Sequence, residues 1–142
     1  MSLLCALGFV AACGQQSPAS TERQSEQVGV TAADAWCRPT PNGARAGACY
    51  VTLKSSGDDR LVSASSARAS DLQIHEMKTQ NGMMTMGELK DGLPLPAGEA
   101  VALSPGGVHL MLMELTQPLL AGDQVPLTLV FDQAPSLVLT AE

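Results

Sequence analysis

Leu72-Gln-Ile-His-Glu-Met-Lys-Thr-Gln-Asn-Gly-Met-Met-Thr-Met-Gly-Glu-Leu89 contains two short segments joined by an Asn-Gly pair. Asn-Gly between two such segments is the strongest short-range signal for a β-hairpin with a two-residue type I′ turn. In that register Met77 faces Met86 and His75 faces Glu88 across the hairpin. The stretch therefore predicts two antiparallel strands, and it fixes which side chains lie opposite each other.

The rest of the chain repeats this pattern of short apolar or alternating segments separated by turn residues. No stretch shows a sustained helical period with capping residues. Further strands are expected over residues 28–36, 48–54, 61–67, 100–103, 108–115, 126–131 and 137–140, with turns over 39–43, 55–59, 91–98 and 104–107. Many short strands with this punctuation predict an all-β sandwich or barrel.

Composition sets the scale of the domain and excludes one class of partner. The chain has 142 residues, enough for one domain, and 45% of them are apolar. Aromatic residues make up only 3%, so the core is expected to be aliphatic. The formal net charge is −6 and no basic run is present, which argues against nucleic acid as a partner.

The N-terminal residues carry the features of an export signal. Residues 1–12 contain an apolar run of signal-peptide length that ends in Val10-Ala-Ala-Cys13, which resembles a bacterial lipobox. We therefore expect a lipoprotein-type signal peptide over residues 1–12 and a lipid on Cys13. The first basic residue is Arg23, so we expect translation to start upstream of Met1. The alternative is a soluble secreted protein cleaved near Cys13.

Residues 13–27 are rich in Ser and Gln and contain no strong apolar side chain. Such a segment cannot bury enough surface to fold, and it predicts a flexible tether. Residues 28–142 then form the folded domain. Both export readings place this domain outside the cytoplasm, in the periplasm or cell envelope, and the lipid on Cys13 would attach it to a membrane.

Cys37 and Cys49 are the cysteines left to the folded domain. In an oxidising compartment such a pair usually forms a disulfide, and the turn-rich segment 39–43 between them can bring two strands together. A bridge closing a loop of this size would stabilise the fold by about 3 kcal/mol. The alternative is a thiol metal site or a redox pair.

The two histidines of the chain each have a methionine on the same expected strand face. His109 and Met111 are two apart on a strand, and His75 and Met86 are diagonal neighbours in the hairpin. Imidazole with thioether is a soft ligand set that suits Cu(I). If the sandwich brings the two faces together, a four-ligand site results. The alternative is that the methionines only fill the core, and Met113 shares the face of Met111.

The spacing His75-(ten residues)-Met86-(twenty-two residues)-His109-Leu-Met111 resembles the copper motif of the PCu(A)C-type periplasmic copper chaperones. The second spacer is one residue longer than in that family, and the extra residue falls in the loops of segment 91–107. Three further stretches resemble the family: Gly92-Leu-Pro-Leu-Pro-Ala-Gly98, Ser104-Pro-Gly-Gly-Val-His-Leu-Met-Leu-Met113 and Gln117-Pro-Leu-Leu-Ala-Gly-Asp-Gln-Val-Pro-Leu-Thr-Leu129. The similarity covers residues 28–140.

The resemblance implies a cupredoxin-like Greek-key β-sandwich that binds one Cu(I) ion through His75, Met86, His109 and Met111. It also implies a metallochaperone that loads copper into a respiratory oxidase subunit or another cuproprotein, beside Sco-type thiol proteins. We expect a monomer, and we expect no enzyme activity because the sequence has no nucleophile elbow or HExxH motif. No histidine follows His109, so one site is expected. The competing readings are a blue-copper electron carrier, which needs a Cys thiolate near the site, and an adhesion or binding sandwich without metal.

Overall fold

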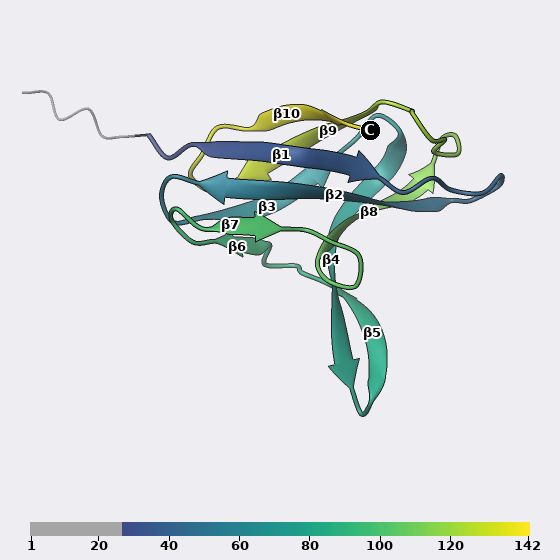
Figure 1. Ribbon diagram of the computed structural model, residues 1–142, viewed down its shortest axis with the longest axis horizontal. Helices are drawn as coiled ribbons and strands as arrows, with labels where there is room; N and C mark the ends of the chain where they lie inside the picture. Colours follow the sequence, from purple (N-terminus) through teal and green to yellow (C-terminus); the bar gives the residue numbers. More distant parts are fainter. Residues whose placement is uncertain (1–26) are drawn as a thin grey trace, which may run out of the picture.

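A computed structural model describes residues 27–142 of the chain, which form ten β-strands and no helix (Figure 1). The predicted signal peptide, the predicted lipid site at Cys13 and nearly all of the predicted tether lie outside the described residues. Within the described part, no helix is long and apolar enough to cross a membrane. The all-β class expected from the sequence is confirmed.

The strands form two antiparallel sheets. The larger sheet has the order β1-β2-β8-β4-β5, with β7 paired to the other part of β2. Its strands are β1 (Val30–Cys37), β2 (Ala46–Ser55), β4 (Ala69–Gln80), β5 (Met83–Glu88), β7 (Ala100–Ala102) and β8 (His109–Leu115). The smaller sheet has the order β10-β9-β3-β6, made by β3 (Asp59–Ser65), β6 (Leu93–Leu95), β9 (Val125–Phe131) and β10 (Leu137–Ala141).

The core between the sheets is aliphatic, as the composition predicts. Strand residues alternate between buried and accessible positions, because successive side chains leave opposite faces of a strand. On β9 this gives buried Val125, Leu127, Leu129 and Phe131 with more accessible residues between them. The largest fully buried side chains are Leu53, Leu61, Leu95, Leu110, Leu112, Leu119, Leu127 and Leu129.

The β4–β5 hairpin has the register that the sequence predicts. Asn81 and Gly82 both have positive φ, 50° and 76°, as a type I′ turn requires. Met77 pairs with Met86, and His75 pairs with Glu88. The turn end of the hairpin extends away from the body of the sandwich (Figure 1).

One segment differs from the sequence prediction. Residues 93–95 were expected within a turn region, yet they form the edge strand β6 with Leu93 and Leu95 buried. Pro94 is exposed between them, which an edge strand tolerates because its neighbour is on one side only. Gly92 precedes the strand with φ of 82°, and a Cβ there would collide with the carbonyl oxygen of Leu61.

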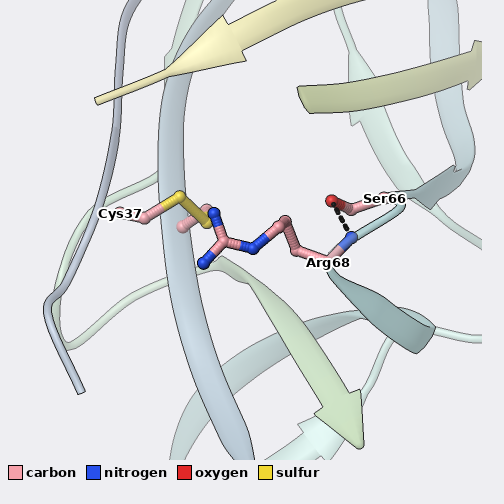
Figure 2. The surroundings of a disulfide bond; sticks show 4 residues. Cys37, Ser66 and Arg68 are labelled. Carbon is pink, nitrogen blue, oxygen red and sulfur yellow. Dashed lines mark hydrogen bonds between the residues drawn. A yellow bond between two sulfur atoms is a disulfide. The ribbon is translucent and has the colours of Figure 1, made fainter. Parts of the chain in front are cut away.

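The predicted disulfide is present. Cys37 and Cys49 are direct partners in the β1–β2 pair, and their sulfurs are bonded (Figure 2). Both half-cystines are buried. The thiol alternatives are therefore wrong in this structure, because neither sulfur is a free thiol.

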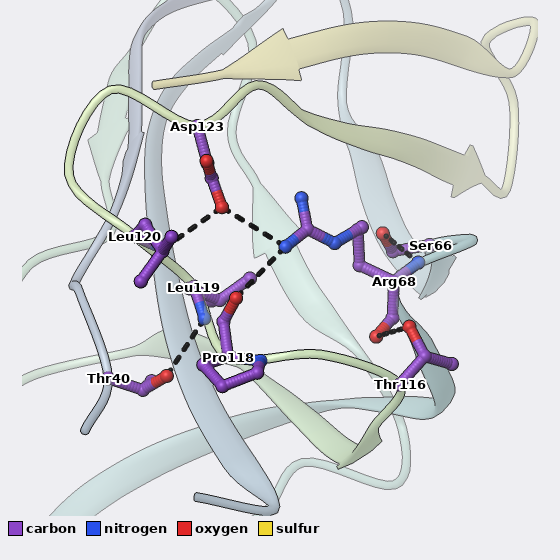
Figure 3. Close-up of polar contacts among 8 residues, drawn as sticks. All are labelled: Thr40, Ser66, Arg68, Thr116, Pro118, Leu119, Leu120 and Asp123. Carbon is purple, nitrogen blue, oxygen red and sulfur yellow. Dashed lines mark hydrogen bonds and ion pairs between the residues drawn. The ribbon is translucent and has the colours of Figure 1, made fainter. Parts of the chain in front are cut away.

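Polar contacts fix the segment that follows Cys37. Thr40 exchanges two hydrogen bonds with Leu119: its amide donates to the Leu119 carbonyl, and its hydroxyl accepts from the Leu119 amide at 2.9 Å. The loop that carries Leu119 is in turn held by Arg68, whose guanidinium donates to the Pro118 carbonyl and to Asp123 (Figure 3). The Leu120 amide and Arg68 lower the pKa of Asp123. The Cys37–Cys49 bridge and the hydrogen bonds of Thr40 thus fix the position of residues 38–41.

Candidate metal centre

Strand pairing within the larger sheet brings the predicted ligands close together. β4 lies between β5 and β8, and the β4–β8 register places His75 directly opposite His109. The β4–β5 register places Met86 opposite Met77, which is two residues from His75. Met111 is two residues from His109 on β8. Directly paired residues and residues two apart share a face, so all four predicted ligands leave the same face of one sheet.

This face is the outer face of the sheet. Leu110, Leu112 and Ile74 occupy the alternate positions of the same strands and are buried in the core. The sequence left open whether the two His/Met faces come together, and the β4–β8 register places them side by side. The faces join because β8 pairs with β4, a contact between segments far apart in the chain.

His109 is the buried member of the group, with 6% of its surface exposed. Its Nδ1 lies 3.2 Å from the carbonyl oxygen of Gly107. Because a carbonyl only accepts, this contact places the proton on Nδ1 and leaves the lone pair of Nε2 for a metal. The ring also lies near Tyr50, at a centroid distance of 6.5 Å, and Tyr50 stacks on Trp36 at 4.5 Å.

His75 is oriented by a neighbour in the same way. Its Nε2 lies 2.8 Å from Oε1 of Gln73, so the proton belongs on Nε2. Its Nδ1 is buried and has no hydrogen-bond partner. A buried polar atom without a partner is uncommon, and a metal ion would satisfy it. The two imidazole centroids are 5.8 Å apart.

The pKa of His75 is lowered, first by burial and then by the neighbouring His109, while Glu88 acts to raise it. A lowered pKa keeps the imidazole neutral over a wider pH range. The neutral ring is the form that binds metals, so this environment favours a ligand role.

A cavity of about 440 Å³ opens beside these side chains. Met86, His109 and Met111 line it, and Met77 and Tyr50 join them. The segment 38–41, held by the disulfide and by Thr40, forms another wall of the same cavity, together with Ala46, Gly47, Ala48, Pro105 and Gly106. His75 does not line the cavity and lies beside His109 instead.

The donor atoms define which metals the site can take. Within residues 27–142, no group of three His, Cys, Asp or Glu side chains could hold a metal ion. Beside His109, the cavity is lined by the thioethers of Met77, Met86 and Met111, and sulfur donors favour a soft ion over Zn²⁺, Mg²⁺ or Ca²⁺. Met113 shares the face but pairs with Asp71 and Ala46 and does not line the cavity.

Three further residues contribute to the site and were not assigned to it from the sequence. Met77 could have been assigned to the site from the sequence, because the predicted hairpin register already placed it opposite Met86. Gln73, two residues before His75 on the same face, could have been found from strand alternation. Tyr50 could not have been found in this way, because its place beside His109 depends on the pairing of β2 with β8.

Solved structures with a similar fold include PCuAC domains. The apo PCuAC domain from PmoF1 has a TM-score of 0.65 at 23% identity, covering 79% of this chain and 90% of that one. The copper-bound PCuAC domain from PmoF2 has a TM-score of 0.64 at 24% identity, covering 79% and 89%. The Cu(I) form of DR1885 from Deinococcus radiodurans has a TM-score of 0.57 at 29% identity, covering 87% and 84%. The expected cupredoxin-like β-sandwich of PCuAC type is confirmed.

Residues 30–142 match the family described as "Putative lipoprotein LpqE-like". The chain belongs to this LpqE-like, PCuAC-type family. A curated relative, a "Putative lipoprotein" of Leifsonia xyli subsp. xyli, is 42% identical over 120 residues, which cover 84% of this chain and 72% of the relative.

Proposed function

We propose that this protein is an extracytoplasmic metallochaperone that binds one Cu(I) ion through His75, Met86, His109 and Met111. The observation that carries the proposal is the direct pairing of His75 with His109, each ring held by a neighbour so that one nitrogen is free. Thioethers on the same face complete a soft N₂S₂ donor set. The structural neighbours named as copper-bound or Cu(I) proteins support copper as the ion.

The exposure of the ligands suits binding followed by release. His109 is 6% exposed, whereas Met86 is 48% exposed on the edge strand β5. The ion would be bound by the buried His109 and would remain accessible to an acceptor protein on the side of Met86. Thioethers have no proton to lose and cannot form disulfides, so they keep binding Cu(I) in an oxidising compartment, although oxidation to sulfoxide would destroy them.

The alternative of a blue-copper electron carrier has less support. Such a site needs a Cys thiolate, and both cysteines among residues 27–142 are joined in the disulfide. The proposal assigns binding and transfer of an ion, and no catalysed reaction.

Delivery and location extend the proposal. We infer that residues 1–12 are a lipoprotein signal, that Cys13 carries the lipid, and that residues 13–27 tether the domain 28–142 to the membrane. A monomeric domain on such a tether could reach a membrane cuproprotein, such as a respiratory oxidase subunit, beside a Sco-type thiol protein. Radiolabelled fatty acid should be incorporated into the protein in its host and not into Cys13→Ser.

The decisive experiment is an anaerobic Cu(I) titration of the purified protein against a chromophoric Cu(I) chelator, with Zn²⁺ and Cu(II) run in parallel. The proposal predicts one tightly bound Cu(I) and weak binding of Zn²⁺. His109→Ala should lose the tight site, while Met113→Leu should keep it. Failure of Cu(I) to compete with the chelator would mean that the His/Met face has another role.

A further inference from the structure

The β4–β5 hairpin continues the thioether face beyond the four proposed ligands. Residues 75, 77 and 79 of β4 share one face, and they are opposite residues 88, 86 and 84 of β5. Met84, opposite Thr79, therefore lies on the same face as Met77 and Met86. The three methionines form a continuous patch that begins at the cavity and runs toward the turn of the hairpin.

These methionines do not serve the core. Every residue of β5 is exposed, including Met84 at 58% and Met86 at 48%. Met77 is half-buried and lines the cavity together with Met86. Large apolar side chains held out of the core on one short edge strand call for a role other than packing.

The two faces of the hairpin differ in chemistry. The thioether face contains Met77, Thr79, Met84 and Met86 between the cavity and the turn, with no charged side chain. The opposite face carries the ion pair of Glu76 and Lys78, with an N–O distance of 2.6 Å. Between the cavity and the turn, the thioether face therefore offers sulfur ligands without a carboxylate, which favours a soft ion there; Glu88, opposite His75, is the carboxylate at the cavity end of the same face.

The geometry allows the three sulfurs to meet at one ion. Met77 and Met86 are directly opposite, which places their Cβ atoms about 5 Å apart, and Met84 is the diagonal neighbour of Met77 at about 7 Å. Methionine side chains have three rotatable bonds, so their sulfurs can converge from such positions. The Thr79 hydroxyl donates to Sδ of Met84 at 3.1 Å and orients this thioether within the patch.

We propose that Met77, Met84 and Met86 form a second, three-thioether Cu(I) site on the hairpin, which exchanges its ion with the N₂S₂ site through the shared Met86. This inference rests on the proposed function. The second site is the transfer site: Cu(I) moves between three sulfurs on the exposed hairpin and the histidines at the cavity. The ion stays Cu(I) throughout, so the exchange needs no oxidant or reductant.

The first test follows the methionine methyl groups by NMR while Cu(I) is added anaerobically to ¹³C-methyl-Met protein. The first equivalent should shift the methyls of Met86 and Met111, and the second should shift those of Met77 and Met84 and shift that of Met86 again, because Met86 is shared by the two sites. Met83, on the opposite face of the same hairpin, should not move. Shifts at the first equivalent without any at Met77 and Met84 would overturn the second site alone. No methyl shift at either equivalent would also contradict the proposed function.

The second test separates transfer from storage. Met84→Leu keeps the size of the side chain and removes only the sulfur, and Met83→Leu is the matched control on the other face. Met84→Leu should keep the tight first equivalent, weaken the second by about tenfold or more, and slow Cu(I) release to a chelator. Met83→Leu should change none of these. Equal effects of the two variants, or no effect of Met84→Leu, would overturn the transfer site.

Discussion

The two faces of β8 have different roles in one short strand. On the inner face, Leu110 and Leu112 are completely buried between the sheets. On the outer face, His109 and Met111 line an open cavity and share this face with the proposed ligands of β4 and β5. Burial of the inner face fixes the position of the strand. Side chains on the outer face can therefore be substituted without losing this burial. Stability and metal binding should be separable by substituting adjacent residues.

The inner face gives the largest expected change in stability. Leu112→Ala removes a fully buried side chain and leaves a cavity in the core, which should lower the free energy of unfolding by about 2–5 kcal/mol. Chemical unfolding of the apo protein measures this. The folded fraction should bind Cu(I) as the unchanged protein does, and a large loss of affinity at temperatures where the variant is folded would show that the two faces are coupled.

Removing the disulfide tests whether stability and metal binding are also separable at the wall of the cavity. Replacing Cys37 and Cys49 together by Ser should lower the free energy of unfolding by about 3 kcal/mol, because the bridge no longer restricts the unfolded chain. Thermal unfolding with and without reductant measures the loss. Cu(I) affinity should survive in the folded variant, since neither sulfur is a proposed ligand; copper loss on reduction alone would instead indicate a thiol-dependent site.

The outer face should show the opposite result. Met111→Leu keeps a similar volume and removes the thioether, so the free energy of unfolding should change by less than about 1.5 kcal/mol. Loss of a direct ligand should raise the Cu(I) dissociation constant by about 100-fold, which corresponds to about 2.7 kcal/mol. Competition titration measures this. Met113→Leu is the control two residues along the same face, and an equal loss there would mean that Met111 is not the ligand.

The smallest expected effect concerns pH. Below pH 6.5 an unperturbed histidine takes up a proton, but burial and His109 lower the pKa of folded His75. The unfolded state then binds more protons, so the apo protein should lose stability as the pH falls below about 6.5. Cu(I) binding at His75 should persist to lower pH than at an ordinary histidine, then fall as the ring protonates.

Glu88→Gln sharpens this pH test. The variant removes the carboxylate opposite His75 that raises its pKa, so the pKa of His75 should fall further. NMR titration of the His75 ring protons measures the shift. A rise in that pKa would show that Glu88 acts on His75 by another route.

Local signals account for the parts of the fold that the sequence predicted correctly. The Asn81-Gly82 turn fixed the hairpin register, because a two-residue type I′ turn, with positive φ at both residues, sets the pairing of the flanking strands. The Cys37–Cys49 bridge was predicted from the expected oxidising compartment and from the turn between the two cysteines, and it is present. The edge strand β6 was missed, because Gly92 and Pro94 are turn residues by composition, and only pairing with β3 makes Leu93–Leu95 a strand.

By itself, the sequence determined which residues share a strand face, since side-chain alternation is a property of the strand alone. It thereby paired His109 with Met111 and placed His75 near Met86. Only the tertiary structure decided that these two pairs lie side by side on the outer face of one sheet. That outcome depends on β8 pairing with β4 in the register that puts His75 opposite His109, and such a pairing between distant segments is set by burial of Leu110 and Leu112 in the common core.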